Sequence, residues 1–405
     1  MMNVTLHIFF LIIFIWSAVN ILYLLIASLA GHFRKKIFYP SNKNKKRIAV
    51  LITSYKEDEV IVDTAREASM HNYPADYFDV YLAADQLQEQ TMNALRVLNI
   101  NISEVRFEAG SKARSLNSLL NNINEENYDI ALVLDGDNIM QDDFLEKINS
   151  AFQKNFRAVQ GHRTAKNQNT PVAILDAISE EANNHLFRKA QRSMGFSSST
   201  IGSGMAFEFK KLKQVYNKAG ILDNPACDRE VDFEMMKAGI IVEYIEDAYV
   251  LDEKVSKRKV YQNQRRRWLE SQMTHLNLFF SEKEQVINKT KDYWNKLFIN
   301  LIPPRIIFVA FFVLIFMIYL LQYLIHFNIT FISIIAWLIL FIAYTFSILL
   351  SIPRKLYTSK ALKALIYIPV LLLAFLKAAA TMRTRRKEFV HTPKSFTDQK
   401  DKPHN

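Results

Sequence analysis

The chain has 405 residues, of which 50% are hydrophobic, and its formal net charge is +11. A single soluble core rarely grows beyond about 300 residues, so at least two structural units are expected. The one cysteine, Cys227, excludes an internal disulfide and a thiolate metal cluster, and it is consistent with a reducing compartment. The basic residues gather beside apolar segments, which favours a membrane surface rich in anionic lipid over nucleic acid as their partner.

The first apolar segment covers residues 4–30 and is long enough to cross a hydrocarbon core of about 30 Å. No basic residue precedes it and a basic run, 34–36, follows it, so the positive-inside rule places the following residues in the cytoplasm. A cleavable signal peptide is the alternative, but the missing basic n-region, the length and the lack of a clear cleavage site favour an anchor. We expect residues 1–32 to form a transmembrane anchor and residues 33–46 a basic linker.

From Ile48 onward the pattern changes to alternating strands and helices. The expected strands are residues 48–52, 78–84, 105–108, 130–134, 158–161 and 205–209, with one or two more in 240–250. The expected helices are residues 58–70, 88–98, 112–122, 142–153, 171–193, 229–238 and 257–280. This order predicts a doubly wound, mostly parallel α/β sheet, which binds its ligands at the carboxyl ends of the strands.

Carboxylates follow three of the predicted strands. Asp135 and Asp137 come directly after the buried fourth strand, Asp85 after the second, and Glu57 or Asp58 after the first. Uncompensated buried charge is costly, and hard oxygen ligands suit Mg²⁺ or Mn²⁺ sharing its shell with substrate phosphates. A turn that only caps the next helix is the alternative for Asp135-Gly-Asp137. Convergence of several carboxylates at one sheet edge favours the metal-and-phosphate interpretation.

Two later segments, residues 306–327 and 329–352, are also long enough to span a membrane. The link at residues 326–328 carries no Lys or Arg and suits the outer face, whereas the basic stretch 353–363 suits the inner face.

Residues 364–382 fit two structures, because they contain Pro369 and Lys377 and have basic residues at both ends. One is a third C-terminal span, and the other is a helix lying in the cytoplasmic interface. We expect a C-terminal membrane domain over residues 286–385 and a disordered polar tail over residues 386–405.

A series of short motifs follows the chain in order: Thr53-Ser-Tyr-Lys-Glu57, Asp85, Gly110-Ser-Lys-Ala-Arg-Ser-Leu-Asn117, Asp135-Gly-Asp137, Gly202-Ser-Gly-Met-Ala-Phe207 and Gln264-Arg-Arg-Arg-Trp268. The series resembles that of family 2 glycosyltransferases with the GT-A fold, most of all the membrane-embedded branch of cellulose, hyaluronan, chitin and mannan synthases. The resemblance covers about residues 48–280, and it implies a catalytic GT-A domain over residues 47–285.

The resemblance also implies site residues for an inverting sugar transfer from a nucleotide-diphosphate sugar, UDP- or GDP-linked. Asp228 would be the catalytic base that takes the proton of the acceptor hydroxyl. Asp135 and Asp137 would bind Mg²⁺ or Mn²⁺, and Gly202, Gly204 and Trp268 would bind the acceptor. The implied donor and nucleotide ligands are Thr53, Tyr55, Glu57, Asp85, Lys112, Asp135, Asp137, Gln264 and Arg267.

The family usually has Thr-Glu-Asp where this chain has Ala226-Cys-Asp228. The aspartate is kept, so the change affects the hydrogen bonding around the base, and we interpret Cys227 as a filler residue rather than a nucleophile. Lys112 also fits a solvated lysine at a helix N-terminus. The residues Arg265 and Arg266 also fit a basic helix on lipid headgroups.

A second group of polar residues, His162, Arg163, Glu180 and Glu181, is interpreted as a solvated loop and a solvated helix face. We expect a multi-pass protein of the cell membrane with a cytoplasmic catalytic domain, and three functions fit this expectation. The first is chain-extending polysaccharide or glycan synthesis, and the second is transfer of a single sugar to a lipid-linked acceptor. The third is an inactive membrane scaffold, which the substitution at Cys227 alone suggests.

Overall fold

The computed structural model describes residues 2–108, 110–222, 224, 227–281, 291–326 and 332–382. Three expectations fall wholly or largely outside the described residues: the polar tail, the link at residues 326–328 beyond His326, and the domain boundary at residues 285–286.

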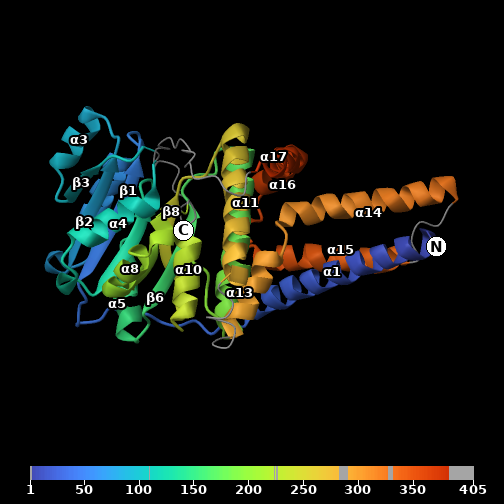
Figure 1. Ribbon diagram of the computed structural model, residues 1–405, viewed down its shortest axis with the longest axis horizontal. Coiled ribbons are helices and arrows are strands. Elements are labelled where there is room, and N and C mark those ends of the chain that lie inside the picture. Colours follow the sequence, from blue (N-terminus) through green and yellow to red (C-terminus); the bar gives the residue numbers. More distant parts are fainter. Residues whose placement is uncertain are drawn as a thin grey trace.

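An eight-stranded sheet with the order β3-β2-β1-β4-β7-β6-β8-β5 forms the centre of the described fold (Figure 1). The strands are β1 (Ile48–Tyr55), β2 (Phe78–Asp85), β3 (Asn101–Val105), β4 (Ile130–Asp135), β5 (Ile139–Met140), β6 (Ala158–Ala165), β7 (Met205–Glu208) and β8 (Val242–Asp252). β7 runs antiparallel to β4 and to β6, and β8 runs parallel to β6. The strands β1, β2, β4, β6 and β8 therefore all point their carboxyl ends to the same edge of the sheet.

The expected third strand at residues 105–108 is wrong, because the strand lies at Asn101–Val105. It forms the outer edge of the sheet beside β2, where none of its residues is fully buried. Its sequence Asn-Ile-Ser-Glu-Val lacks the continuous apolar run of the central strands, since an edge strand has less surface to bury.

Helices cover both faces of the sheet (Figure 1). The described helices of residues 48–301 are α2 (Ile61–Ser69), α3 (Glu89–Arg96), α4 (Lys112–Asn122), α5 (Phe144–Gln153), α6 (Pro171–Asn184), α7 (Ala190–Ser193), α8 (Phe209–Tyr216), α9 (Ala219–Leu222), α10 (Cys227–Lys237), α11 (Arg258–Ser281) and α13 (Lys291–Leu301). Of these, α11 and α13 stand between the sheet and the long apolar helices (Figure 1). Successive residues of β1 face opposite sides of the sheet. Val50 and Ile52 belong to the core formed with α2, α3 and α5. Ala49 and Leu51 belong to the core formed with α4, α8 and α10. A short π-helix, His185–Lys189, joins α6 to α7, so the expected helix 171–193 is interrupted.

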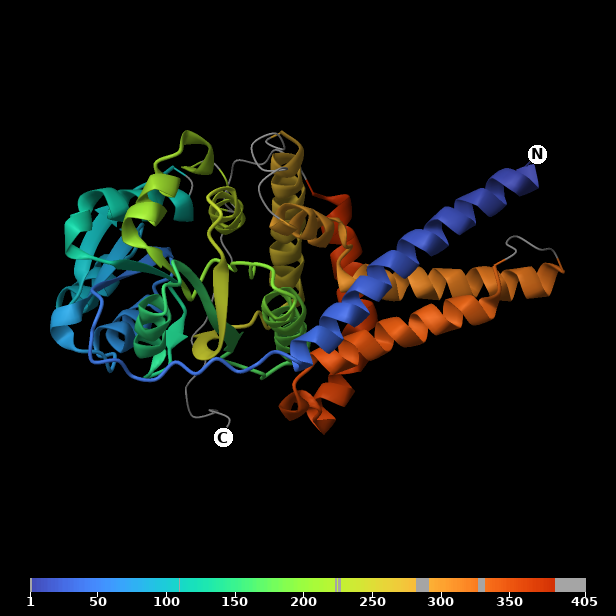
Figure 2. The ribbon, with the colours of Figure 1, turned by 90° about the horizontal axis from the view of Figure 1, so that it is seen from below.

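Four helical segments are long and apolar enough to cross a membrane, among the residues the structure describes. The helices are α1 (Met2–His32), α14 (Arg305–Ile325), α15 (Ile334–Ser351) and the pair α16 (Ser359–Ala364) and α17 (Ile368–Ala380). α1, α14 and α15 extend together away from the sheet (Figures 1 and 2). Trp337 of α15 packs edge-on against Phe14 of α1. α17 instead runs across the direction of these three helices (Figure 2). It packs against α11 through Leu371, Ala374 and Tyr261.

Candidate active site

The Asp135-Gly-Asp137 turn lies at the carboxyl end of β4, where Asp135 is in register with Thr53 of β1. Asp137 is buried, and its carboxylate accepts hydrogen bonds from the Asn138 amide (3.3 Å) and from the backbone N–H of Glu253 (3.3 Å). The turn does not cap the next helix, because α5 begins at Phe144 with Asp143 as its N-cap residue.

Gly136 brings a third carboxylate to this turn. A Cβ at this position would collide with Oε2 of Glu57 and would lie 3.2 Å from the backbone oxygen of Thr53. The glycine therefore allows Glu57, from the loop after β1, to lie against the turn beside Asp135 and Asp137.

Two cations face these carboxylates. Lys112, at the start of α4, donates to the carboxylate of Asp135 and to the carbonyl oxygen of Gly202 (2.5 Å). Burial alone would lower the pKa of Lys112, but Asp135 and its neighbours raise it, so the ammonium stays charged. Burial also lowers the pKa of Arg267 on α11, and the charges of Asp135, Asp228 and Glu57 oppose that effect. Lys112 is thus an ion-paired residue of the site. The alternative interpretation, a solvated lysine at a helix N-terminus, is wrong.

Asp228 lies in the first turn of α10, on the other side of the Gly202 loop. Gly202 has a φ of +85°, and a Cβ there would lie 3.3 Å from Oδ2 of Asp228 and 3.5 Å from Nζ of Lys112. The Thr200 hydroxyl donates to the backbone oxygen of Asp228 (2.9 Å), which ties this loop to α10. Asp228, the expected base, and Lys112, the expected phosphate ligand, therefore both lie next to Gly202. Gly204, two residues later, also has a positive φ, +63°.

Cys227 is buried beside this group, and the Tyr216 hydroxyl lies 3.6 Å from its sulfur. Burial raises the pKa of the Cys227 thiol to about 12, while Lys112 opposes the shift. The thiolate is the reactive form of cysteine, so its population at pH 8 is more than about 10³-fold below that of an unperturbed thiol.

We therefore predict that Cys227 resists alkylation by N-ethylmaleimide in the folded protein and reacts at an ordinary rate after denaturation. Mass spectrometry of timed reactions at pH 8 would measure both rates. Equal rates in the two states would show that the thiol is neither buried nor raised in pKa.

Asp85 is the last residue of β2, in register with Tyr55 of β1. Its Oδ1 accepts the backbone N–H of Phe107 (3.4 Å), and its Oδ2 is buried and has no hydrogen-bond partner among the residues that the structure describes. Burial raises the pKa of this carboxyl. A buried acceptor without a donor is costly, so this oxygen is suited to a ligand that donates. A Cβ at Gly110 would collide with the Tyr55 ring, so the glycine makes room for that ring.

The helix α11 contributes more than Arg267. Arg265 is buried and donates to the carboxylate of Asp176 on α6. Its Cζ lies 4.5 Å from the centroid of the Tyr261 ring and 3.9 Å from that of the Trp268 ring. The alternative that places Arg265 on lipid headgroups is wrong, because Asp176 compensates its charge inside the protein. Trp268 lies against this guanidinium and is 39% exposed. Oε1 of Gln264, also on α11, is buried, and no described residue forms a hydrogen bond with it.

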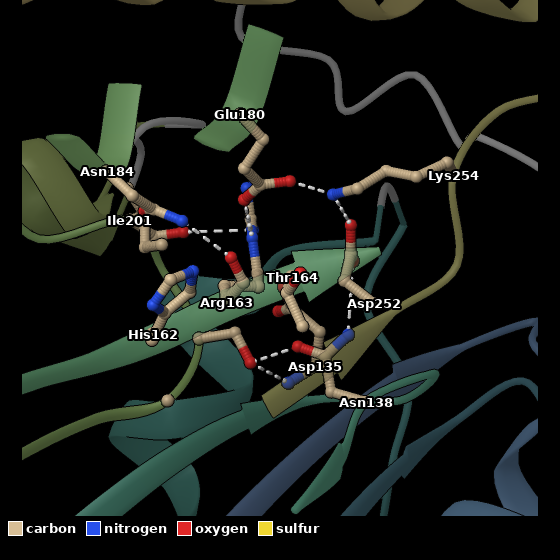
Figure 3. Close-up of polar contacts among 12 residues, drawn as sticks. Asp135, Asn138, His162, Arg163, Thr164, Glu180, Asn184, Ile201, Asp252 and Lys254 are labelled. Carbon is tan, nitrogen blue, oxygen red and sulfur yellow. Dashed lines mark hydrogen bonds and ion pairs between the residues drawn. The ribbon is translucent and has the colours of Figure 1, made fainter. Parts of the chain in front are cut away.

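The interpretation of His162, Arg163, Glu180 and Glu181 as solvated is also wrong. β6 continues to Ala165 and α6 packs beside it, so these side chains face one another between the two elements. Arg163 donates to Glu180 (2.6 Å) (Figure 3). His162 shares a hydrogen bond with Glu181 (2.9 Å).

The sequence interpretation missed four further polar residues near the turn. Asn138, Asp252 and Lys254 are labelled in Figure 3, and the fourth is Ser203. All four are buried and hydrogen-bonded to one another or to the turn. A signal for Asp252 was present, since it ends β8 as Asp135 ends β4. Using that signal required knowing that β8 runs in the same direction as β4.

A divalent cation fits the turn by its ligand chemistry. No group of three or more His, Cys, Asp and Glu side chains able to hold a metal ion occurs among the described residues. Asp135 and Asp137 supply hard oxygen ligands from one turn, and the carboxylate of Glu57 lies against it. Two carboxylates are the usual protein share for Mg²⁺ or Mn²⁺ when phosphates and water complete the shell.

Comparison with known proteins gives three results. The family model for glycosyltransferase-like family 2 matches residues 46–271. The structure of mannosyltransferase PcManGT from Pyrobaculum calidifontis in complex with GDP-Man and Mn²⁺ is similar, with a TM-score of 0.53 and 14% identity over 93% of this chain and 97% of that one. S. aureus TarS 1–349 in complex with UDP has a TM-score of 0.39 and 12% identity over 61% of this chain and 67% of that one.

No curated protein matches the sequence. The mannosyltransferase likeness and the sheet order confirm the expected fold class, a mostly parallel GT-A α/β sheet with long apolar helices at both ends.

Proposed function

Because the chain belongs to glycosyltransferase-like family 2, we propose that it transfers a sugar with inversion from a nucleotide-diphosphate sugar to a glycan acceptor at the cytoplasmic face of the cell membrane. The observation that supports this most is the meeting of Asp135, Lys112, Asp228 and Arg267 around the Gly202 loop. This reaction needs carboxylates that hold a cation, positively charged side chains that face the diphosphate, and a separate carboxylate that accepts a proton.

On the donor side, Asp135 and Asp137 would hold Mg²⁺ or Mn²⁺, which supplies neutralisation of the charge that develops on the diphosphate leaving group. Lys112 would exchange its contact with Asp135 for a diphosphate oxygen, and Arg267 offers a planar pair of donors to the same group. GDP-Man and Mn²⁺ in the mannosyltransferase structure support a nucleotide-sugar donor and a divalent cation.

Asp85 would accept a hydrogen bond from the nucleobase, with Thr53, Tyr55 and Glu57 beside it. We predict that Asp85→Asn raises the donor KM by about 10- to 100-fold, because a hydrogen bond to a charged group contributes about 1.5–3 kcal/mol. Since burial raises the pKa of Asp85, nucleotide binding should weaken as the pH falls, and the variant should lose that dependence. Calorimetric titration with UDP and GDP at several pH values would check both, and an unchanged affinity would remove Asp85 from the donor site.

On the acceptor side, Asp228 would take the proton from the attacking hydroxyl as the bond to the diphosphate breaks. Gly202 leaves space beside this carboxylate, Gly204 follows it in the same loop, and Trp268 offers a partly exposed aromatic face to the acceptor. A single base and no covalent intermediate give inversion at the anomeric carbon.

We propose that α1, α14 and α15 span the membrane and that α16 and α17 lie at its cytoplasmic surface. The crosswise direction of α17 supports the second alternative for residues 364–382 (Figure 2). Residues 47–285 would be the cytoplasmic catalytic domain and residues 286–385 the membrane domain.

The second candidate, single-sugar transfer to a lipid-linked acceptor, is favoured by the packing of the spans. α1, α14 and α15 share one aromatic core, and their buried Asn20, Ser28 and Ser347 hydrogen-bond within their own helices. The described spans of one chain thus enclose apolar side chains rather than a polar path for a glycan.

A screen of nucleotide-sugar donors with the purified full-length protein in nanodiscs tests the proposal. Released nucleoside diphosphate identifies the donor, and gel analysis separates one added sugar from a ladder. Absence of both release and product with every donor would contradict the proposed activity.

A further inference from the structure

Asn138 connects the metal-binding turn to two other segments. It is buried, and its amide nitrogen donates to Asp137 (3.3 Å) and to Asp252 at the end of β8 (3.1 Å). Its amide oxygen accepts from the Ser203 hydroxyl, which in turn accepts the backbone N–H of Asp135 (3.0 Å). Asparagine is suited to this position because it donates to two carboxylates and accepts from a hydroxyl at the same time.

Behind Asn138 lies a chain of buried ion pairs with alternating charge (Figure 3). Lys254 pairs with Asp252 (2.5 Å) and with Glu180 of α6, and Arg163 of β6 pairs with Glu180 (2.6 Å). The side chain of Lys254 is only 3% exposed. Desolvation offsets most of the attraction in such pairs, so their net contribution to stability is small.

Both ends of this chain reach the candidate active site. Asn138 holds the carboxylate of Asp137 at one end. At the other, Arg163 donates to the carbonyl oxygen of Ile201 (3.2 Å), the residue before the Gly202 loop that faces Asp228. The contacts thus join the turn on the donor side to the loop on the acceptor side through β6, α6 and β8.

We infer that Asn138 and the pairs Asp252–Lys254–Glu180–Arg163 are positioning residues, which fix the Asp137 carboxylate for the cation and hold the donor turn and acceptor loop in one arrangement. The inference rests on the proposed function in one respect, the binding of the cation by Asp137. Partners that orient a metal ligand typically change metal affinity by about 10- to 100-fold when they are removed.

The test is Mn²⁺ binding to the full-length protein in detergent with saturating UDP, and separately with GDP, followed by the electron paramagnetic resonance signal of free Mn²⁺. Asn138→Ala is expected to weaken Mn²⁺ binding by about 10- to 100-fold. The matched control is Asn149→Ala, because Asn149 is equally buried and hydrogen-bonds the backbone of Lys46 (3.0 Å) and Asn44 (3.1 Å) away from the turn. This control should lower the melting temperature without changing Mn²⁺ affinity.

Glu180→Gln provides a second test that keeps the side-chain shape and removes one charge from the chain. It should weaken Mn²⁺ binding in the same direction, whereas Glu146→Gln, which breaks the distant pair with Lys45 (2.5 Å), should not.

Asp137→Asn separates the two levels of the argument. Lost Mn²⁺ binding in Asp137→Asn, together with native affinity in folded Asn138→Ala and Glu180→Gln, would overturn the positioning role and leave the proposed function intact. Native Mn²⁺ affinity in Asp137→Asn would overturn the cation site and the positioning role together.

Discussion

Asp228→Asn is expected to reduce sugar transfer by about 10²- to 10⁴-fold, the usual contribution of a general base, while nucleoside diphosphate binding persists. The substitution keeps the shape of the side chain but removes its ability to take a proton. The Thr200 contact to the backbone oxygen of residue 228 does not depend on the side chain, so the loop should keep its position. The loss should therefore appear in kcat with little change in the donor KM.

The control for this experiment is Asp63→Asn. Asp63 also lies in the first turn of a helix, α2, but it is exposed and pairs with Arg66 away from the site. Initial rates of nucleoside diphosphate release and calorimetric titration with the nucleotide would measure both effects. Native activity in Asp228→Asn would remove this residue as the base, and a native protein inactive with every donor would favour the membrane scaffold instead.

Much of this site could be predicted from the sequence because the carboxyl ends of parallel strands lie at the same edge of a sheet. This rule placed Asp85 and Asp135 together. The continuous apolar runs of β1 and β4 identified the central strands, and both were confirmed. The rule missed Arg163, near the end of β6, and Asp252, the last residue of β8, although both strands run in the same direction as β4. Their direction depends on β7, a four-residue antiparallel strand between β4 and β6, and no periodicity in the sequence reveals such pairing.

Burial of charge was the second property that the sequence pattern misjudged. Arg265 lies in a stretch rich in charged residues, and Glu180 stands next to Glu181; such residues usually lie on solvated helix faces. Their partners, Asp176 and Lys254, are far away in the sequence, and only the tertiary packing brings them together. Local patterns record the charge of a residue but not the distant group that compensates it.

The pair between Arg265 and Asp176 gives the largest expected effect on stability. Arg265→Met should lower the free energy of unfolding by about 3–5 kcal/mol, because it leaves the carboxylate of Asp176 buried without its cation. The combined variant Arg265→Met with Asp176→Leu should recover most of that loss, since apolar groups of similar volume replace the ion pair. Thermal unfolding in detergent would rank the native protein and the two variants.

Arg66→Met is the control for this experiment, because Arg66 forms an exposed pair with Asp63 (2.7 Å) that should contribute no more than about 1 kcal/mol. Trp268 follows Arg265 on α11 and lies on its guanidinium, so the single variant should also increase the exposure of the indole. A red shift of tryptophan fluorescence in the single variant would report that change. If Arg265→Met were as stable as Arg66→Met, the pair would not be the contact that holds α11 against α6.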